Sequence, residues 1–232
     1  MKSEHLKTEL ITNVSHDIKT PLTSIINYSD LIYKEETENE KIKEYAEVLH
    51  RQSGRLKKLI EDLMEASKVS TGNVEVNLEL CDIGVLLTQI TGEFQQRMLE
   101  QELEIIAKQP EQPILILADS KLLWRVMDNL MSNICKYSQK GTRVYVEVEE
   151  ADGDASIRLK NISNYPLNIS ADELMERFVR GDRSRHTEGN GLGLSIAKSL
   201  TELQGGSLEL SVDGDLFKVT IAFPIQNQSF EK

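Results

Sequence analysis

The sequence predicts an α+β protein with two domains, a helical hairpin followed by helices over a mostly antiparallel sheet. Apolar residues recur at spacings of three and four through about residue 68, which is typical of amphipathic helices. A polar break follows at 68–73, and beyond it helical segments alternate with short runs in which every second residue is apolar. We expect a hairpin over 1–70, a linker over 71–78, a second domain over 79–226 and a tail over 227–232.

The predicted hairpin joins two helices through an acidic loop at 35–40. Each helix carries an apolar stripe, with one gap at Ser29 in the first and one polar interruption at Gln52 in the second. Two helices alone cannot cover a stripe on both members, so we expect a homodimer in which two hairpins form a four-helix bundle. The alternative is packing against the rest of the chain. The stripes comprise Ile11, Val14, Ile18, Leu22, Ile25 and Ile32, then Tyr45, Leu49, Leu56, Leu59, Leu63 and Ala66.

The second domain is predicted from a change of pattern beyond the linker. Periodic apolar residues indicate helices over 83–102 and 121–137 and after Gly193, whereas alternating residues indicate strands. A final hairpin should turn at 213–215. The expected strands are 103–107, 114–117, the segments around Val146 and Ile157, and two strands over 208–212 and 217–223.

Composition excludes several classes of partner. The formal charge of −11 argues against nucleic acid or an anionic membrane, since both require clustered Lys and Arg. Cys81 and Cys135 are too few and too far apart for a disulfide framework or a CxxC metal site, which fits a reducing cytoplasm. No apolar run approaches the roughly 20 residues that cross a bilayer, so we expect no direct membrane contact by this segment.

Residues 15–22 place a histidine beside a carboxylate on the first helix. His16 and Asp17 lie off the apolar stripe, so the imidazole should face water or an incoming partner. At neutral pH much imidazole is uncharged and has a free lone pair, and an adjacent carboxylate can fix its tautomer and aim Nε2 outward. Thr20 lies one turn along the same face, and Pro21 should bend the helix. A lone surface histidine usually has no function, but this combination predicts a nitrogen nucleophile.

A glycine-rich turn and an asparagine-bearing helix predict a phosphate site. Gly189, Gly191 and Gly193 precede a helix, so backbone amides and the helix dipole can face an anion. The spacing is neither a P-loop nor a dinucleotide fingerprint, and alone it is a weak signal. Asn129, Asn133 and Lys136 share one face of a second helix. An ordinary amphipathic helix would look the same, but an amide oxygen suited to Mg²⁺ and a charge suited to phosphate favour a site.

These motifs, in this order, resemble the sensor histidine kinases of two-component signalling over nearly the whole chain. Residues 8–68 resemble the dimerisation and phosphotransfer hairpin, and residues 75–225 resemble the Bergerat-type ATP-binding domain shared with gyrase and heat-shock chaperone ATPases. The resemblance implies autophosphorylation with ATP and Mg²⁺, phosphotransfer to an aspartate of a cognate response regulator, and phosphatase activity toward that regulator. It also implies a cytoplasmic location, either alone or as the cytoplasmic part of a membrane-anchored sensor.

The resemblance assigns roles to individual residues. In the hairpin, His16 would be the phosphoacceptor, Asp17 its acid/base partner and Thr20 the residue that positions water for phosphatase activity. In the ATP-binding domain, the N box, the F box, the start of a lid and the G2 box would contact the nucleotide. The N box comprises Asn129 and Asn133, the implied Mg²⁺ ligand, with Lys136 and Tyr137 beside them. Phe178 would be the F-box residue, and Arg180 would stand at the start of the lid. The G2 box comprises Gly189, Gly191 and Gly193, followed by Leu194.

One segment departs from the family pattern. The G1 box is usually Asp-x-Gly-x-Gly, whose carboxylate accepts a hydrogen bond from the adenine amine. Here Asn161, Ser163 and Tyr165 stand at the aligned positions. Asn161 can still accept through its amide oxygen, but a neutral acceptor forms a weaker bond, and the other two lack the freedom of glycine. We expect ATP binding to be retained but weakened.

Two other functions remain open at this point. A Bergerat ATPase that acts as a mechanical clamp would hydrolyse ATP regardless of His16, and a scaffold that has lost ATP through the altered Asn161 segment would not hydrolyse it. The kinase mechanism requires the ATP domain to swing on a hinge near Gly72, so that His16 Nε2 meets the terminal phosphate in line.

Overall fold

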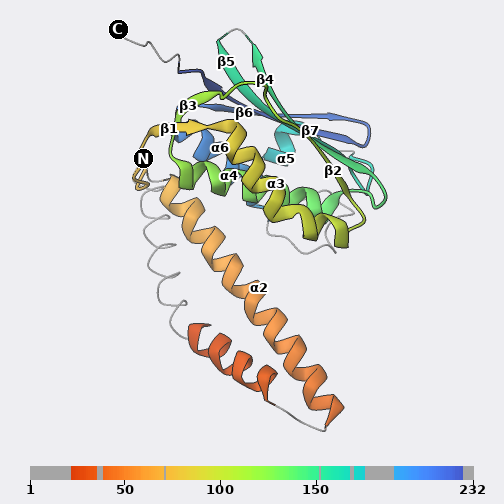
Figure 1. Cartoon of the computed structure of the whole chain (residues 1–232). Helices are drawn as coiled ribbons and strands as arrows, with labels where there is room; N and C mark the ends of the chain where they lie inside the picture. The colour runs from red at the N-terminus through yellow and green to blue at the C-terminus, as the bar shows by residue number, and fades with distance from the viewer. Residues whose placement is uncertain are drawn as a thin grey trace. The chain divides into compact units, whose positions relative to one another are not determined.

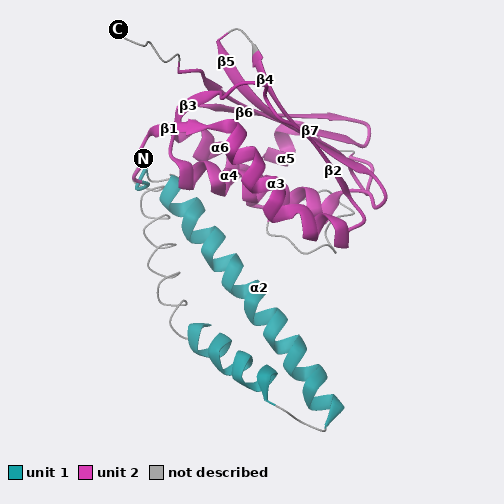
Figure 2. Cartoon of the chain, viewed as in Figure 1, with its two compact units in different colours: residues 1–74 teal, residues 75–232 magenta. Residues whose placement is uncertain are grey.

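The computed structural model divides the chain into two compact units, residues 1–74 and residues 75–232 (Figure 2). Each is described here by itself. The structure describes residues 22–35, 39–70, 72–151, 153–167, 170–175 and 191–226.

The first unit is a pair of helices, residues 22–34 and α2 (Glu40–Ser70) (Figure 1). The Tyr33 ring stacks on the His50 imidazole with 4.9 Å between ring centroids, so the two helices lie against each other. Within each helix, one set of buried residues recurs every seven positions, and most members of this set are small, which allows close approach of the backbones. The set comprises Leu22 and Ser29 in the first helix and Ala46, Ser53, Ile60 and Ser67 in α2; Asp62 and Ala66 in α2 are buried as well.

The predicted apolar stripes are only partly covered within one chain. Ser29, the gap in the first stripe, is almost fully buried, whereas Ile25 and Ile32 are about half exposed (50% and 46%). On α2, Leu49 and Leu56 are 42% and 43% exposed. The contact between the two helices therefore uses a neighbouring line of small residues and leaves much of the larger apolar surface open.

The second unit packs helices on one face of a five-stranded sheet, with a two-stranded ribbon beside it (Figure 1). The sheet order is β2-β4-β5-β7-β6, and among the described strands the β2–β4 pair is parallel while the other three pairs are antiparallel. The helices are α3 (Ile83–Glu100), α4 (Ser120–Tyr137), α5 (Ala171–Met175) and α6 (Gly193–Leu203). The strands are β1 (Glu79–Asp82), β2 (Glu104–Lys108), β3 (Leu115–Ala118), β4 (Arg143–Ala151), β5 (Asp154–Ile162), β6 (Ser207–Asp213) and β7 (Leu216–Pro224).

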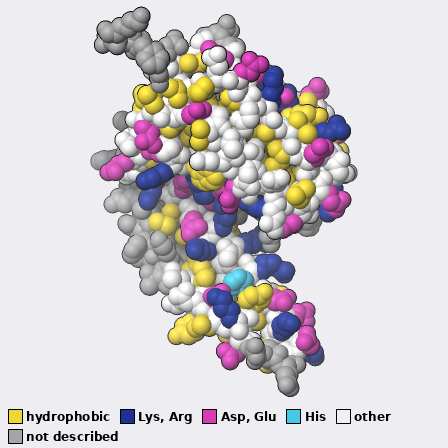
Figure 3. Space-filling view, in the orientation of Figure 1, with side chains coloured by type: hydrophobic (Ala, Val, Ile, Leu, Met, Phe, Trp, Pro, Cys, Tyr) yellow, Lys and Arg dark blue, Asp and Glu magenta, His cyan; other side chains and the backbone are white. Residues whose placement is uncertain are grey.

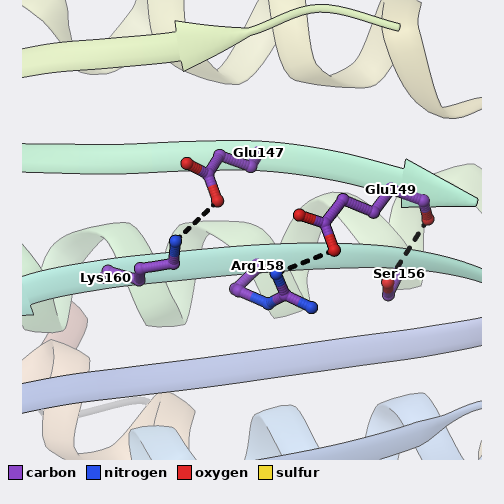
Figure 4. A network of polar contacts seen from close by, with 5 residues as sticks. All are labelled: Glu147, Glu149, Ser156, Arg158 and Lys160. Carbon is purple, nitrogen blue, oxygen red and sulfur yellow. Dashed lines mark hydrogen bonds and ion pairs between the residues drawn. The ribbon is translucent and has the colours of Figure 1, made fainter.

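The sheet has one apolar and one charged face. Along β5, Ala155, Ile157 and Leu159 are buried, and Asn161 continues this alternating series as a buried polar residue. The opposite face carries cross-strand ion pairs (Figure 4), with Lys160 Nζ 2.7 Å from a carboxylate oxygen of Glu147 and Arg158 pairing with Glu149 at 2.8 Å. Such a pattern is expected where helices cover one face only.

The α+β architecture with a mostly antiparallel sheet is confirmed. The strand β1 and the short helix α5 were not predicted, and the other differences lie at element ends. The helix predicted to reach residue 102 ends at Glu100, because Glu102 has a left-handed φ of 58° that a helix cannot contain. Among the described residues, no helix is long and apolar enough to span a membrane.

Candidate nucleotide site and the phosphoacceptor segment

Helix α4 is held at its start by a buried carboxylate. Asp119 Oδ1 accepts hydrogen bonds from the amides of Lys121 and Leu122 at 3.0 and 3.1 Å, which is a standard N-cap. Its Oδ2 accepts from the Asn77 amide at 3.0 Å, and its own amide donates to Gln204 Oε1 at 2.9 Å. The cap therefore connects α4 both to the segment before β1 and to the end of α6.

The structure brings the asparagine helix and the glycine turn together. α4 packs against α6. A Cβ built on Gly193 would lie 3.7 Å from Asn129 Oδ1, so the first residue of α6 adjoins the Asn129 amide. Asn129 is buried, unlike a residue on the polar outer face of an ordinary amphipathic helix, and its Nδ2 has no partner within the described chain. An unpartnered buried donor beside a glycine is suited to a polar ligand.

The other predicted residues of this helix follow in its last two turns. Asn133 and Tyr137 are partly exposed and Lys136 is exposed, so their side chains are accessible from the same helix that carries Asn129. Ser138, the C-cap of α4, lies five positions after Asn133, which is roughly 7.5 Å along a helix axis.

The start of α6 is suited to an anion. Leu192 at the N-cap makes no side-chain capping bond, and Ile196 donates its amide to the Leu192 carbonyl at 2.9 Å. The amides of the first turn, from Gly193 through Leu194, have no intrahelical acceptor, as at any helix start. Gly191 has a φ of +67°, a conformation that favours glycine, so this part of the turn requires the residue found there.

Asn161 lies at the end of β5 with its amide held in one orientation. The side chain is 4% exposed. Its Nδ2 donates to Ser138 Oγ at 2.9 Å and to the Ile162 carbonyl at 3.4 Å, whereas its Oδ1 is buried and has no partner within the described chain. The exocyclic amine of a base is a hydrogen-bond donor, so it can bind this unpartnered acceptor.

Backbone bonds fasten the end of α4 to the end of β5. The Gln139 amide donates to the Ile162 carbonyl and the Asn164 amide donates to the Tyr137 carbonyl, both at 2.8 Å, on either side of a bridge between Ser138 and Ser163. These bonds fix Ser138 next to Asn161. Ser138 was not among the site residues predicted from the sequence. Its signal in the sequence was weak: a serine directly after a predicted helix.

Several predicted site residues lie outside the described residues. These are His16, Asp17, Thr20, Phe178, Arg180 and Gly189.

Comparison with protein families identifies two domains in this chain. The family model of the His Kinase A (phospho-acceptor) domain matches residues 6–72. That of the histidine kinase-, DNA gyrase B- and HSP90-like ATPases matches residues 118–227. The chain belongs to the two-component sensor histidine kinases. The phosphoacceptor-domain match includes His16, and the ATPase match includes residues 129–137 and 189–194.

The named relatives of this chain are longer proteins. It is 32% identical over 235 residues to the sensor protein VanSC of Enterococcus gallinarum, covering 97% of this chain and 63% of VanSC. It is 28% identical over 233 residues to the sensor histidine kinase WalK of Bacillus subtilis, covering 98% of this chain and 38% of WalK. The chain thus spans less than two thirds of either relative.

Solved structures share the fold. Full-length ShkA, crystallised in complex with AMPPNP, superposes with a TM-score of 0.77 at 23% identity, over 94% of this chain and 46% of ShkA. The Acinetobacter baumannii histidine kinase AdeS gives a TM-score of 0.64 at 20% identity, over 91% of this chain and 98% of the AdeS chain.

Proposed function

We propose that this chain is an ATP-dependent protein-histidine kinase that phosphorylates itself on His16 and passes the phosphoryl group to an aspartate of a response regulator. The observation that carries the proposal is the meeting of Asn129 and Gly193 in the ATPase domain of a chain whose phosphoacceptor domain contains His16. Asp17 would orient the imidazole and take up its proton, and Thr20 would position water for dephosphorylation of the regulator.

The residues of the second unit fit a bound nucleotide. The buried, unpartnered Asn161 Oδ1 is available to the adenine amine, and the first amides of α6 are available to phosphate oxygens. Lys136 and Tyr137 would line the nucleotide, with Phe178 and Arg180 completing the site. Mg²⁺, held by the Asn133 amide oxygen, would neutralise phosphate charge.

The hairpin supports a homodimer as the working unit. Its exposed apolar line recurs every seven residues on α2, and a second hairpin would cover it in a four-helix bundle. Ile42, Leu49 and Leu56 lie on this line and are 47%, 42% and 43% exposed in one chain. We expect the bundle surface near His16 to receive the response regulator.

Delivery of phosphate requires the two units to move relative to one another. Gly72 lies between α2 and β1 and has a φ of +69°, a conformation open mainly to glycine. We propose that this position permits the ATP domain to approach His16 and to withdraw, so that regulator and nucleotide use the same imidazole in turn.

Labelling of the full chain with γ-labelled ATP tests the proposal. We expect acid-labile, base-stable label in the wild-type protein and its loss in His16→Gln, because only a phosphoramidate combines these stabilities. His50→Gln, on the same hairpin, is the matched control and should label normally.

Each other outcome supports a different function. ATP hydrolysis that His16→Gln leaves unchanged, with no acid-labile label, would support a mechanical ATPase. Absence of nucleotide binding would support a scaffold. Label that persists in His16→Gln would exclude that residue as the acceptor.

A further inference from the structure

We propose that Ser138 is a positioning residue for nucleobase recognition: it holds the Asn161 amide so that Oδ1 faces the 6-amino group of adenine. This inference rests on the proposed nucleotide site and deepens it. It concerns the substitution of a neutral amide for the usual carboxylate, which changes what the protein must do to recognise the base.

A carboxylate presents an acceptor in either rotamer, but an amide does not. If the Asn161 side chain turned over, Nδ2 would face the base, where it would oppose the adenine amine, and Oδ1 would face inward. An asparagine at this position therefore recognises adenine only if something fixes its orientation.

The Ile162 carbonyl selects that orientation, and the Ser138 hydroxyl, which can either accept or donate, anchors the side chain in it. Ser138 Oγ and the Ile162 carbonyl lie 2.9 and 3.4 Å from Nδ2. A carbonyl oxygen can only accept, so the turned-over amide would place Asn161 Oδ1 against the Ile162 carbonyl oxygen with no hydrogen between them. Ser138 Oγ supplies the shorter of the two bonds, and both residues are buried, so water does not replace it readily.

Ser138 is itself fixed by the backbone. Its amide donates to the Ile134 carbonyl at 3.0 Å as the C-cap of α4, and its bridge to Ser163 joins it to the segment after β5. The hydroxyl therefore does not need the nucleotide in order to adopt its place, and the acceptor at Asn161 is formed before the base arrives.

Calorimetric titration of the full chain with paired nucleoside diphosphates isolates the amine contact. ADP and purine riboside diphosphate differ only in the 6-amino group, and neither transfers a γ-phosphate. We expect ADP to bind wild-type protein about fivefold more tightly, the value of one neutral hydrogen bond. In Ser138→Ala this ratio should fall toward one, and Ser138→Thr, which keeps the hydroxyl, should restore it.

The ratio separates positioning from general loosening, because disturbed packing weakens both nucleotides alike. Asn161→Ala should also bring the ratio to one, and Asn161→Asp should raise it above the wild-type value because charged acceptors bond roughly twice as strongly. Equal binding of the two nucleotides by wild-type protein, or an unchanged ratio in folded Ser138→Ala, would overturn the inference. Failure of wild-type protein to bind ADP at all would instead overturn the proposed nucleotide site.

Discussion

At Gly206, between α6 and β6, the space for a side chain is already occupied. A Cβ at this position would lie 2.6 Å from Phe223 Cε1 and 2.8 Å from the Ala222 carbonyl oxygen, both well inside contact distance. Phe223 is buried on β7 and cannot swing into solvent, and a backbone oxygen cannot move alone. The glycine is required here by the close approach of the chain to β7.

We expect Gly206→Ala to lower the free energy of unfolding by about 1–3 kcal/mol, the usual cost of overpacking. Gly92→Ala in α3 is the control, because no atom lies within 4 Å of its added Cβ and alanine favours helix; it should stabilise by about 0.5–1 kcal/mol. Urea unfolding followed by circular dichroism measures both. Equal stability of Gly206→Ala and wild type would show that the strand end relaxes without strain.

The sequence indicates the role of Asn161, whereas its hydrogen-bond partner depends on the packing of α4 and β5. Its place in the family motif suggested an adenine contact, and the structure shows that it continues the buried series of Ile157 and Leu159 along β5. Its hydrogen bond to Ser138, 23 residues earlier, could not be predicted because it depends on how closely α4 approaches β5.

Among the helices, α4 depends on long-range bonds at its N-terminus. The Asp119 carboxyl is buried, and burial raises its pKa, but the amides of Asn77, Leu122 and Lys121 outweigh this and bring the pKa below its usual value of 3.8. A lowered pKa in the folded state means that this carboxylate stabilises the protein above about pH 4. That contribution is lost as the pH falls through the lower folded-state pKa.

We expect Asp119→Ala to destabilise the protein by about 1–3 kcal/mol at neutral pH, because it removes a cap and leaves the Asn77 amide without its part-buried acceptor. Asp82→Ala, at the N-cap of α3, is the comparison: Asp82 caps only its own helix, so the loss should be smaller. Below the folded-state pKa the difference between Asp119→Ala and wild type should shrink. The measurement is the free energy of unfolding of wild type and variants between pH 2.5 and 7, a range chosen to bracket about pH 4. Curves for Asp119→Ala and wild type that stay parallel over this range would contradict the prediction.

At the scale of the whole molecule, the exposed apolar line of α2 (Ile42, Leu49 and Leu56) is a surface that one chain leaves uncovered. The sequence indicated this surface through its period, and the structure shows which residues the hairpin covers by itself and which it leaves open. Exposed leucines in a regular row favour association with a second copy.

We expect Leu49→Glu combined with Leu56→Glu to convert a dimer to a monomer in sedimentation velocity, because two charges per chain would be buried at the centre of the bundle. Nucleotide binding should remain, since the ATPase unit is unchanged. Arg51→Glu, an exposed position on the opposite side of α2, should leave the dimer intact. A double variant that still sediments as a dimer would show that the association uses another surface.

The sequence by itself determined the order and kind of the elements other than β1 and α5, together with the β6–β7 hairpin turn and the family motifs, because each depends on neighbours within a few residues. Only the tertiary structure decided that Asn129 is buried against Gly193, that Ser29 rather than Ile25 is enclosed in the hairpin, and that Asp119 meets Gln204, 85 residues away. The physical reason is range: periodicity specifies which face of an element is apolar, whereas the partner of a buried polar atom is set by the packing of elements that the periodicity does not specify.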